Sequence, residues 1–196
     1  YRKDGRPERL GNGGRMGSTI TQWDGNLLME IQHFVIHEGL TPLVKFITHL
    51  GDAGSIWIAL ILLMLCFKKT RRVGVIAATA LILSFVVNNL MLKNLVGRIR
   101  PYEMFTGVQR LVEKPSDWSF PSGHSAASFV TAVVMFRELP RKYGVPALTL
   151  AFLIALSRLY VGVHYPLDVL CGALSGTIIA LLVCRFYERK DVLSKW

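Results

Sequence analysis

Five long runs of apolar residues, separated by short polar stretches, dominate this sequence. They cover residues 53–67, 73–92, 122–136, 145–163 and 167–184. A helix needs about 20 apolar residues to cross the hydrocarbon core of a bilayer, so neighbouring residues must extend the shorter runs. The pattern therefore predicts an all-α protein, a polytopic membrane helical bundle with five transmembrane helices.

Residues 27–50 follow a different pattern, in which polar side chains interrupt the apolar ones. Glu30, His33 and His37 recur at spacings of three and four, which places them on one face of a helix. We expect an N-terminal amphipathic helical region, interfacial or packed on the bundle. The pattern leaves open whether it crosses the membrane as a sixth span. Histidines on a polar face are seldom metal ligands, so no metal site is assigned to it.

The N-terminal residues 1–16 have no apolar segment and are rich in glycine and arginine. We interpret residues 1–16 as a tail outside the fold and residues 17–196 as a single domain embedded in the membrane. The pattern leaves open whether the residues ahead of Met16 belong to the natural chain. We expect no cleavable signal peptide, because residues 1–26 lack an apolar core segment.

Composition supports the membrane assignment. Hydrophobic residues make up 52% of the chain and charged residues only 18%, which is unlike most soluble domains. The formal net charge is +10, but the cations gather at the ends of apolar runs and form no basic face with interleaved aromatics. This argues against nucleic acid as a partner and favours membrane lipids with anionic headgroups. The three cysteines lie inside or at the edge of apolar runs and suggest neither a disulfide framework nor a metal site.

Positive charge also predicts the orientation of the bundle. Residues 68–72, residues 137–142 and the basic C-terminal tail should be cytoplasmic, and five alternating spans do place all three on one side. The same alternation brings three polar clusters, at 93–101, 121–124 and 157–168, to the opposite, extracytoplasmic face. These clusters are the candidate site.

The first cluster contains Lys93 and Arg100, which are seven residues apart and can point the same way from a helix. Pro101 then favours an end to the helix. A guanidinium fork and an ammonium aimed at one point suit a phosphate group. Contact with lipid headgroups at the end of a span is an equally good explanation of this cluster alone.

The second cluster is Pro121-Ser122-Gly123-His124. Ser122 is a good helix N-cap, and Gly123 lets a ligand approach the backbone closely. The free N–H groups of the first helical turn form an anion site, where His124 can donate a proton to a leaving oxygen.

In the third cluster His164 and Asp168 are four residues apart across the start of a predicted helix. A carboxylate near one imidazole nitrogen fixes the tautomer and leaves the other nitrogen as a nucleophile. Arg158, six residues before His164, can reach the same phosphate. A simple polar cap would explain this cluster alone, but three such clusters at one face favour a phosphate site.

Together the clusters resemble the three-part signature of the type 2 phosphatidic acid phosphatase superfamily. That signature is Lys-x6-Arg-Pro, Pro-Ser-Gly-His and Ser-Arg-x5-His-x3-Asp. It is present here at Lys93–Pro101, Pro121–His124 and Ser157–Asp168, with no departure at a defining position.

The resemblance implies a role for each site residue. His164 would attack phosphorus to form a phosphohistidine, with Asp168 orienting it, and His124 would protonate the leaving group and then help to activate water. The phosphate oxygens would be held by the remaining residues of the signature: Lys93, Arg100, Ser122, Gly123 and Arg158. No metal or cofactor is expected, because cations and amides supply the charge stabilisation.

The implied function is an integral-membrane lipid phosphatase, similar to bacterial undecaprenyl-diphosphatases and phosphatidylglycerophosphatases, with its site on the extracytoplasmic face of a bacterial-type plasma membrane. Undecaprenyl diphosphate, phosphatidylglycerophosphate and phosphatidic acid are the candidate lipid phosphate substrates. A lipid phosphotransferase that uses the same histidine is an alternative. A non-catalytic lipid-phosphate binder or transport subunit would be expected to have lost the nucleophile, and vanadium haloperoxidases share the signature but are soluble. The sequence does not indicate an oligomeric state.

Overall fold

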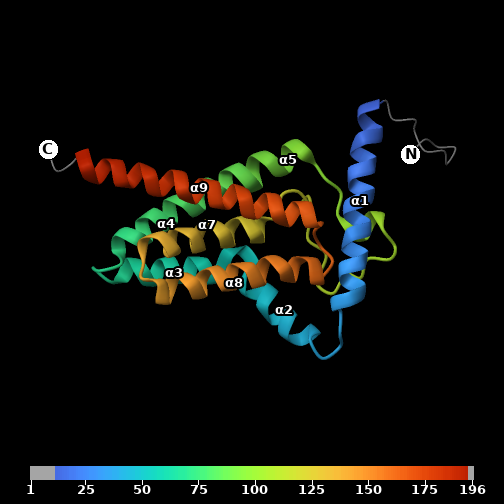
Figure 1. The fold of residues 1–196 in the computed structure, drawn as a ribbon, viewed down its shortest axis with the longest axis horizontal. Coiled ribbons are helices and arrows are strands. Elements are labelled where there is room, and N and C mark those ends of the chain that lie inside the picture. The colour runs from blue at the N-terminus through green and yellow to red at the C-terminus, as the bar shows by residue number, and fades with distance from the viewer. Residues whose placement is uncertain (1–11, 194–196) are drawn as a thin grey trace.

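The computed structural model describes the backbone of residues 12–193 and the side chains of residues 19–189 (Figure 1). These residues form helices joined mostly by short turns, with one long loop at 105–122 and no strand among them, which confirms the all-α prediction. In chain order the elements are α1 (Asn12–Val35), α2 (Thr41–Leu50), the 3-10 turn η1 (Asp52–Gly54), α3 (Ser55–Cys66), α4 (Arg71–Ser84), the π-helical segment η2 (Phe85–Leu92), α5 (Lys93–Val96), α6 (Pro101–Met104), α7 (Gly123–Glu138), α8 (Arg141–Tyr160) and α9 (Pro166–Leu193).

All five apolar runs are helical, and the described residues contain three stretches long and apolar enough to cross a membrane: Arg71–Met104, Arg141–Tyr160 and Pro166–Arg189. Helix α2 and the segment Asp52–Cys66 together make a fourth, bent by 46° at the break between them. Helix α7 has 16 residues, fewer than the roughly 20 that a span needs. These helices point to a membrane protein, and the layout of five spans stays a prediction.

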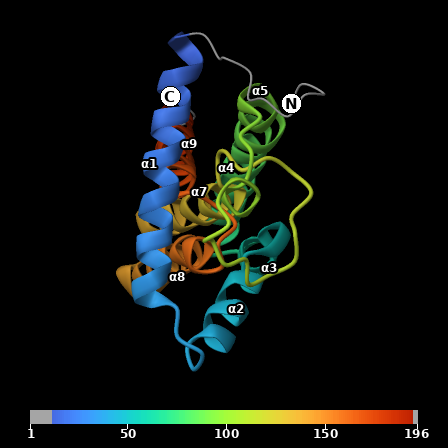
Figure 2. The same ribbon diagram turned by 90° about the vertical axis from the view of Figure 1, so that its right-hand side faces the viewer.

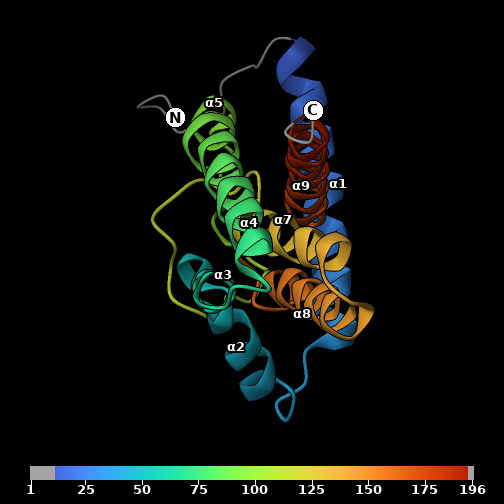
Figure 3. The same ribbon diagram turned by 90° about the vertical axis from the view of Figure 1, so that its left-hand side faces the viewer.

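Helix α7 occupies the centre of the bundle, between α4, α8 and α9 (Figure 3). Two glycines of α9 allow that helix to approach α7 closely. A Cβ atom at Gly172 of α9 would lie 2.5 Å from the carbonyl oxygen of Ser122, and one at Gly176 would lie 2.5 Å from that of Ala126. The main apolar core packs around this contact and includes Trp57, Ile76 and Ile154. The start of α7 is therefore fixed against α9.

The helices alternate in direction, so their connections gather at two ends. The turns at 67–70 and 139–140 and the end of α9 lie at one end, as Figure 3 shows from that side. The loops at 97–122 and 161–165 and the turn η1 lie at the other. The three polar clusters therefore share one end of the bundle, and the cation-rich segments lie at the opposite end.

Helix α1 runs across the cluster end, crosswise to the bundle axis (Figures 1 and 2). The region predicted to be amphipathic is the second half of α1 together with α2, with a turn between them. Glu30, His33 and His37 are all exposed, in keeping with a polar stripe. Helix α1 already begins at Asn12, earlier than the sequence pattern suggested, and residues 1–11 of the predicted tail lie outside the described residues.

Candidate active site

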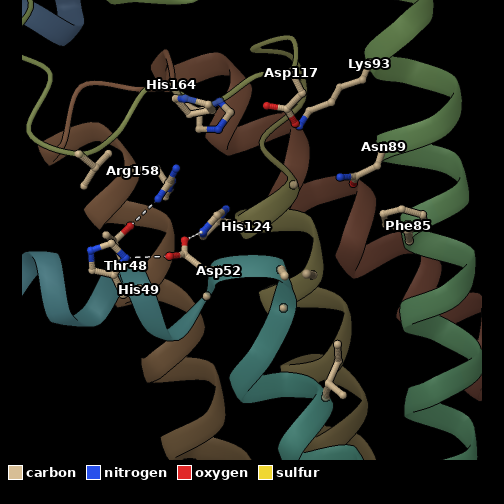
Figure 4. Close-up of a pocket in the computed structure, with 18 of the residues that line it drawn as sticks. Thr48, His49, Asp52, Phe85, Asn89, Lys93, Asp117, His124, Arg158 and His164 are labelled. Atoms are coloured by element: carbon tan, nitrogen blue, oxygen red, sulfur yellow. Dashed lines mark hydrogen bonds and ion pairs between the residues drawn. The ribbon is translucent and has the colours of Figure 1, made fainter.

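A cavity of about 1420 Å³ opens at the cluster end of the bundle (Figure 4). Six of the eight residues predicted for the site line it: Lys93, Arg100, Gly123, His124, Arg158 and His164. The other two, Ser122 and Asp168, are fully buried behind its wall. Predicted residues that are up to 71 positions apart in the sequence, from Lys93 to His164, thus line one cavity.

His164 lies at the back of the cavity with its two ring nitrogens in different surroundings. Its Nδ1 is 3.5 Å from Oδ2 of Asp168, and its Nε2 is 3.4 Å from a guanidinium nitrogen of Arg100. Nε2 is therefore the nitrogen on the cation side of the ring. Burial lowers the pKa of His164 to about 3, although Asp168 opposes this shift. The imidazole is consequently neutral at physiological pH and keeps a lone pair for nucleophilic attack.

Asp168 is held from several sides in the first turn of α9. Its Oδ2 accepts hydrogen bonds from Ser119 Oγ at 2.5 Å and from the backbone N–H of Tyr165 at 3.0 Å. Its Oδ1 accepts one from Arg98 at 2.6 Å. Sequence reasoning missed both Ser119 and Arg98, which lie inside or between the motifs but at positions that the signature does not define.

The second cluster forms the N-terminus of α7 as expected. Ser122 is the N-cap residue, and its Oγ accepts a hydrogen bond from the backbone N–H of Ser125 at 3.3 Å. Gly123 is crowded on one side, because a Cβ there would lie 3.1 Å from the side-chain amide of Asn89. A larger side chain would not fit there, and Gly123 brings the first turn of α7, whose N–H groups have no partner within the helix, to the cavity.

His124 has a carboxylate partner that the sequence did not suggest. Its Nε2 is 2.9 Å from Oδ1 of Asp52, and the other oxygen of Asp52 is 2.7 Å from Nδ1 of His49 (Figure 4). Asp52 comes from the turn η1 between α2 and α3. Because Asp52 engages Nε2, the nitrogen of His124 that is left for a substrate is Nδ1.

Asp117 neutralises two of the three predicted phosphate-binding cations. Its Oδ2 pairs with Lys93, and its Oδ1 accepts a hydrogen bond from Arg100 at 2.5 Å. Burial alone would raise the pKa of Asp117, but Lys93 and Arg100 outweigh it and lower this pKa to about 2. The carboxylate is therefore charged, and it sits where an anionic ligand of these two cations would bind.

Arg158 has donor capacity to spare. One of its terminal nitrogens donates to Thr48 Oγ1 at 2.6 Å, while its Nε is buried with no hydrogen-bond partner. A buried N–H without a partner is costly, so an acceptor in the cavity would be bound favourably there.

Beyond the charged residues, the cavity wall becomes apolar. Helices α3 and α4 and the start of η2 contribute Ile58, Ile61, Leu62, Leu81, Ile82 and Phe85. Several of these also reach the outer surface: Leu62 is 57% and Ile82 is 66% exposed. A ligand with a charged head and an apolar tail matches this change from polar to apolar lining.

A family model described as the PAP2 superfamily matches residues 73–191, a range that contains all three clusters. The chain belongs to the PAP2 superfamily. Among curated relatives, the undecaprenyl-diphosphatase of Sulfolobus acidocaldarius is 33% identical over 143 residues, which cover 73% of this chain and 68% of that protein.

Two solved structures of PAP2 proteins have a similar fold. The Aquifex aeolicus LpxE structure has a TM-score of 0.73 and 30% sequence identity, covering 82% of this chain and 93% of that one. The PAP2-type phosphatidylglycerolphosphate phosphatase of Bacillus subtilis has a TM-score of 0.71 and 29% identity, covering 87% of each chain. Several relatives have names that state a phosphatase activity on a lipid phosphate, whereas a Bacillus licheniformis relative, 35% identical over 147 residues, is named a bacitracin transport permease protein. The PAP2 match begins after η1, so Asp52 and the whole of α1 lie outside it.

Proposed function

We propose that this chain is an integral-membrane lipid phosphatase that hydrolyses a phosphate monoester or diphosphate on a lipid. The observation that carries the proposal is the position of His164: a neutral, buried imidazole whose Nε2 lies beside Arg100, in a cavity that also contains His124. The apolar continuation of the same cavity supports a lipid as the substrate.

In the first chemical step, the Nε2 lone pair of His164 attacks phosphorus. A P–N bond forms, the bond from phosphorus to the leaving oxygen breaks, and that oxygen takes a proton from His124. The imidazole of His164 becomes positively charged, and Asp168 at 3.5 Å stabilises this charge.

In the second step, water attacks the phosphohistidine. His124, now neutral, takes a proton from the water as the new P–O bond forms and the P–N bond breaks. Inorganic phosphate leaves, and His164 returns to its neutral form. Each histidine thus ends the cycle in the state in which it began.

Positive groups on several elements would hold the phosphoryl oxygens during both steps. Arg158 contributes its unpartnered Nε, and the first turn of α7 contributes backbone N–H groups beside Gly123. Lys93 and Arg100 would either release Asp117 and bind the substrate phosphate, or contact the carboxylate and the phosphate at the same time. These donors supply charge stabilisation without a metal ion.

The substrate class follows from the chemistry of the cavity and from the relatives. We propose a polyprenyl diphosphate such as undecaprenyl diphosphate, or a glycerophospholipid monoester such as phosphatidylglycerophosphate or phosphatidic acid. The names of the Sulfolobus and Bacillus relatives support the first two of these. We further propose that the site faces the extracytoplasmic side of a bacterial-type plasma membrane, since the cation-rich segments at 68–72 and 137–142 lie at the other end of the bundle.

The test is release of inorganic phosphate in detergent from these three lipids, with a chelator present. The intact protein is expected to release phosphate from at least one of them, and the His164→Gln variant from none. Release that disappears on chelation would contradict the metal-independent mechanism. Activity retained by the variant would exclude His164 as the nucleophile, and transfer of phosphate to an added lipid alcohol instead of water would favour a phosphotransferase.

A further inference from the structure

The inward face of α1 carries a stripe of buried residues that the PAP2 signature does not include. Asp24, Leu28 and Gln32 follow one another at intervals of four, and each has 4% exposure or less. Gln32 donates hydrogen bonds to the carbonyls of Gln109 and Tyr160, both at 3.0 Å. Helix α1 is therefore fastened to the loops that carry the site, and Asp24 is the charged residue of this face.

Asp24 connects to the nucleophile through one arginine. Its Oδ2 accepts a hydrogen bond from Nη2 of Arg98 at 2.7 Å, while Nη1 of Arg98 donates to Oδ1 of Asp168 at 2.6 Å. Oδ2 of Asp168 then faces Nδ1 of His164 at 3.5 Å. Two ion pairs thus lead from α1 to Asp168, and a longer polar contact without a formed hydrogen bond leads on to the neutral imidazole.

The geometry of Arg98 is closely constrained. Its guanidinium carbon lies 3.8 Å from the centroid of the Tyr165 ring, and its backbone carbonyl accepts a hydrogen bond from Ser119 N–H at 2.8 Å. The other oxygen of Asp24 accepts one from Leu167 N–H at 3.1 Å, directly before Asp168. The planar guanidinium group of Arg98 therefore has a fixed position between the carboxylates of Asp24 and Asp168.

Both carboxylates are completely buried, which makes the arrangement costly in free energy. Burial raises the pKa of Asp24, and the hydrogen bonds from Arg98 and Leu167 oppose this shift. An apolar contact would attach α1 to the bundle at lower cost. A buried network of charges that ends at the proposed nucleophile suggests a role in positioning.

We propose that Arg98 is a positioning residue for the nucleophile and that Asp24 holds it in place, so that α1 is part of the catalytic apparatus. The proposal rests on the proposed function of His164. By binding Oδ1 of Asp168, Arg98 stops the carboxylate from rotating and keeps Oδ2 toward His164. The imidazole is thereby held in one orientation, with Nε2 toward the phosphate.

A double-mutant cycle separates positioning from a merely structural role. Lysine at position 98 keeps the charge but cannot bridge two carboxylates as a guanidinium does. We expect Arg98→Lys to lower kcat about 10-fold to 100-fold, the equivalent of one hydrogen bond to a charged group, with KM within about twofold. In an Asp168→Asn background the same change should lower kcat less than about threefold, because Arg98 acts through Asp168. Equal losses in both backgrounds, or a change in KM alone, would overturn the proposal.

Asp24→Asn provides a second variant that nearly preserves shape and covers the case in which Arg98→Lys fails to fold. It should lower kcat by several-fold, again only when Asp168 is present, and unchanged kcat would contradict the role of α1. Arg137→Lys is the matched control, since Arg137 pairs with Glu188 at 2.8 Å on the exposed opposite end of the bundle. It should leave kcat unchanged.

A measurement that needs no turnover distinguishes failure of this proposal from failure of the proposed function. In protein with 15N-labelled histidine, the ring resonances of His164 can be assigned by their loss in His164→Gln. We expect them to shift in Arg98→Lys and Asp24→Asn and to stay in place in Arg137→Lys. Unmoved resonances would overturn the positioning role even in an active enzyme, while shifted resonances in an inactive protein would support it and refute only the phosphatase assignment.

Discussion

Oδ1 of Asp52 lies 2.9 Å from Nε2 of His124, which gives the proposed general acid a carboxylate partner of its own. The site thus has two His–Asp pairs, one at each proposed catalytic histidine. A neighbouring carboxylate favours the protonated form of an imidazole, the form that a general acid needs. Burial of the His124 ring and the neighbouring cations Arg158 and Lys93 act in the opposite direction, so the protonated form depends on Asp52.

We therefore expect Asp52→Asn to weaken protonation of the leaving group. The kcat for a lipid phosphate should fall about 10-fold or more, since general acid catalysis contributes roughly 10²-fold to 10⁴-fold. The alkaline limb of the rate profile should move to lower pH, because His124 loses the carboxylate that favours its protonated form. Steady-state rates from pH 5 to 9 check both expectations.

The choice of substrate makes this test specific. p-Nitrophenyl phosphate has a good leaving group that needs little protonation, so Asp52→Asn should affect its hydrolysis much less. The control is Glu188→Gln, which removes a carboxylate from an exposed ion pair far from the cavity. Equal losses with both substrates would show that Asp52 acts in some way other than through the general acid.

Asp117 should compete with phosphate for Lys93 and Arg100. In Asp117→Asn the two cations lose their anionic partner, so we expect inorganic phosphate and tungstate to inhibit about 10-fold more strongly. The variant should also be less stable, since Lys93 is only 5% exposed and would be left without a carboxylate. Inhibition constants and thermal unfolding with and without phosphate measure both effects. Weaker inhibition would mean that Asp117 organises the cations for phosphate and does not compete with it.

The lowered pKa of Asp117 predicts that the stability of the protein depends on pH. The folded-state pKa of Asp117, about 2, is below its ordinary value of 3.8, so the unfolded chain binds the proton more readily. The stabilisation is therefore complete above about pH 4 and is lost as the pH falls toward 2. We expect Asp117→Asn to flatten the acid side of a plot of unfolding temperature against pH. If the variant lost stability in acid as the natural chain does, other carboxylates would be the cause of the acid sensitivity.

The contact between α7 and α9 predicts a steric effect. A Cβ at Gly172 would lie 2.5 Å from the carbonyl oxygen of Ser122, so Gly172→Ala must push α9 away from the start of α7. We expect a loss of about 1–3 kcal/mol in unfolding free energy, with lower activity because Asp168 moves with α9. Gly39→Ala is the matched control, since nothing lies within 4 Å of a Cβ there. Thermal unfolding in detergent compares the two, and equal stabilities would contradict the close packing.

The sequence predicted several parts of the site that depend on local spacing, but the expected helix from Lys93 to Arg100 was wrong, because α5 ends at Val96 and Gly97 is left-handed. His164 and Asp168 are four residues apart across the start of α9, and Ser122 caps α7, so short-range rules sufficed for both. Helical runs were equally readable from apolar residues. The number of membrane spans could not be predicted in the same way, because α7 has only 16 residues and α2 joins α3 through a bend of 46°.

The partners that the sequence did not reveal are distant in the chain. Asp52 precedes His124 by 72 positions, and Asp24 precedes Arg98 by 74. A single acidic residue in a helix or turn carries no local pattern that marks it as buried or paired. Only the packing of α1 and η1 against the end of the bundle brings these carboxylates to the motifs.

The central claim is that His164 carries the phosphoryl group during turnover, and trapping the intermediate tests it most directly. The enzyme would be mixed rapidly with a 32P-labelled lipid phosphate, quenched in base, digested and analysed by mass spectrometry. We predict a phosphoryl group on His164 that is stable in base and labile in acid, and no labelled enzyme in His164→Gln. A label on any other residue, or phosphate release by His164→Gln at the natural rate, would contradict the account.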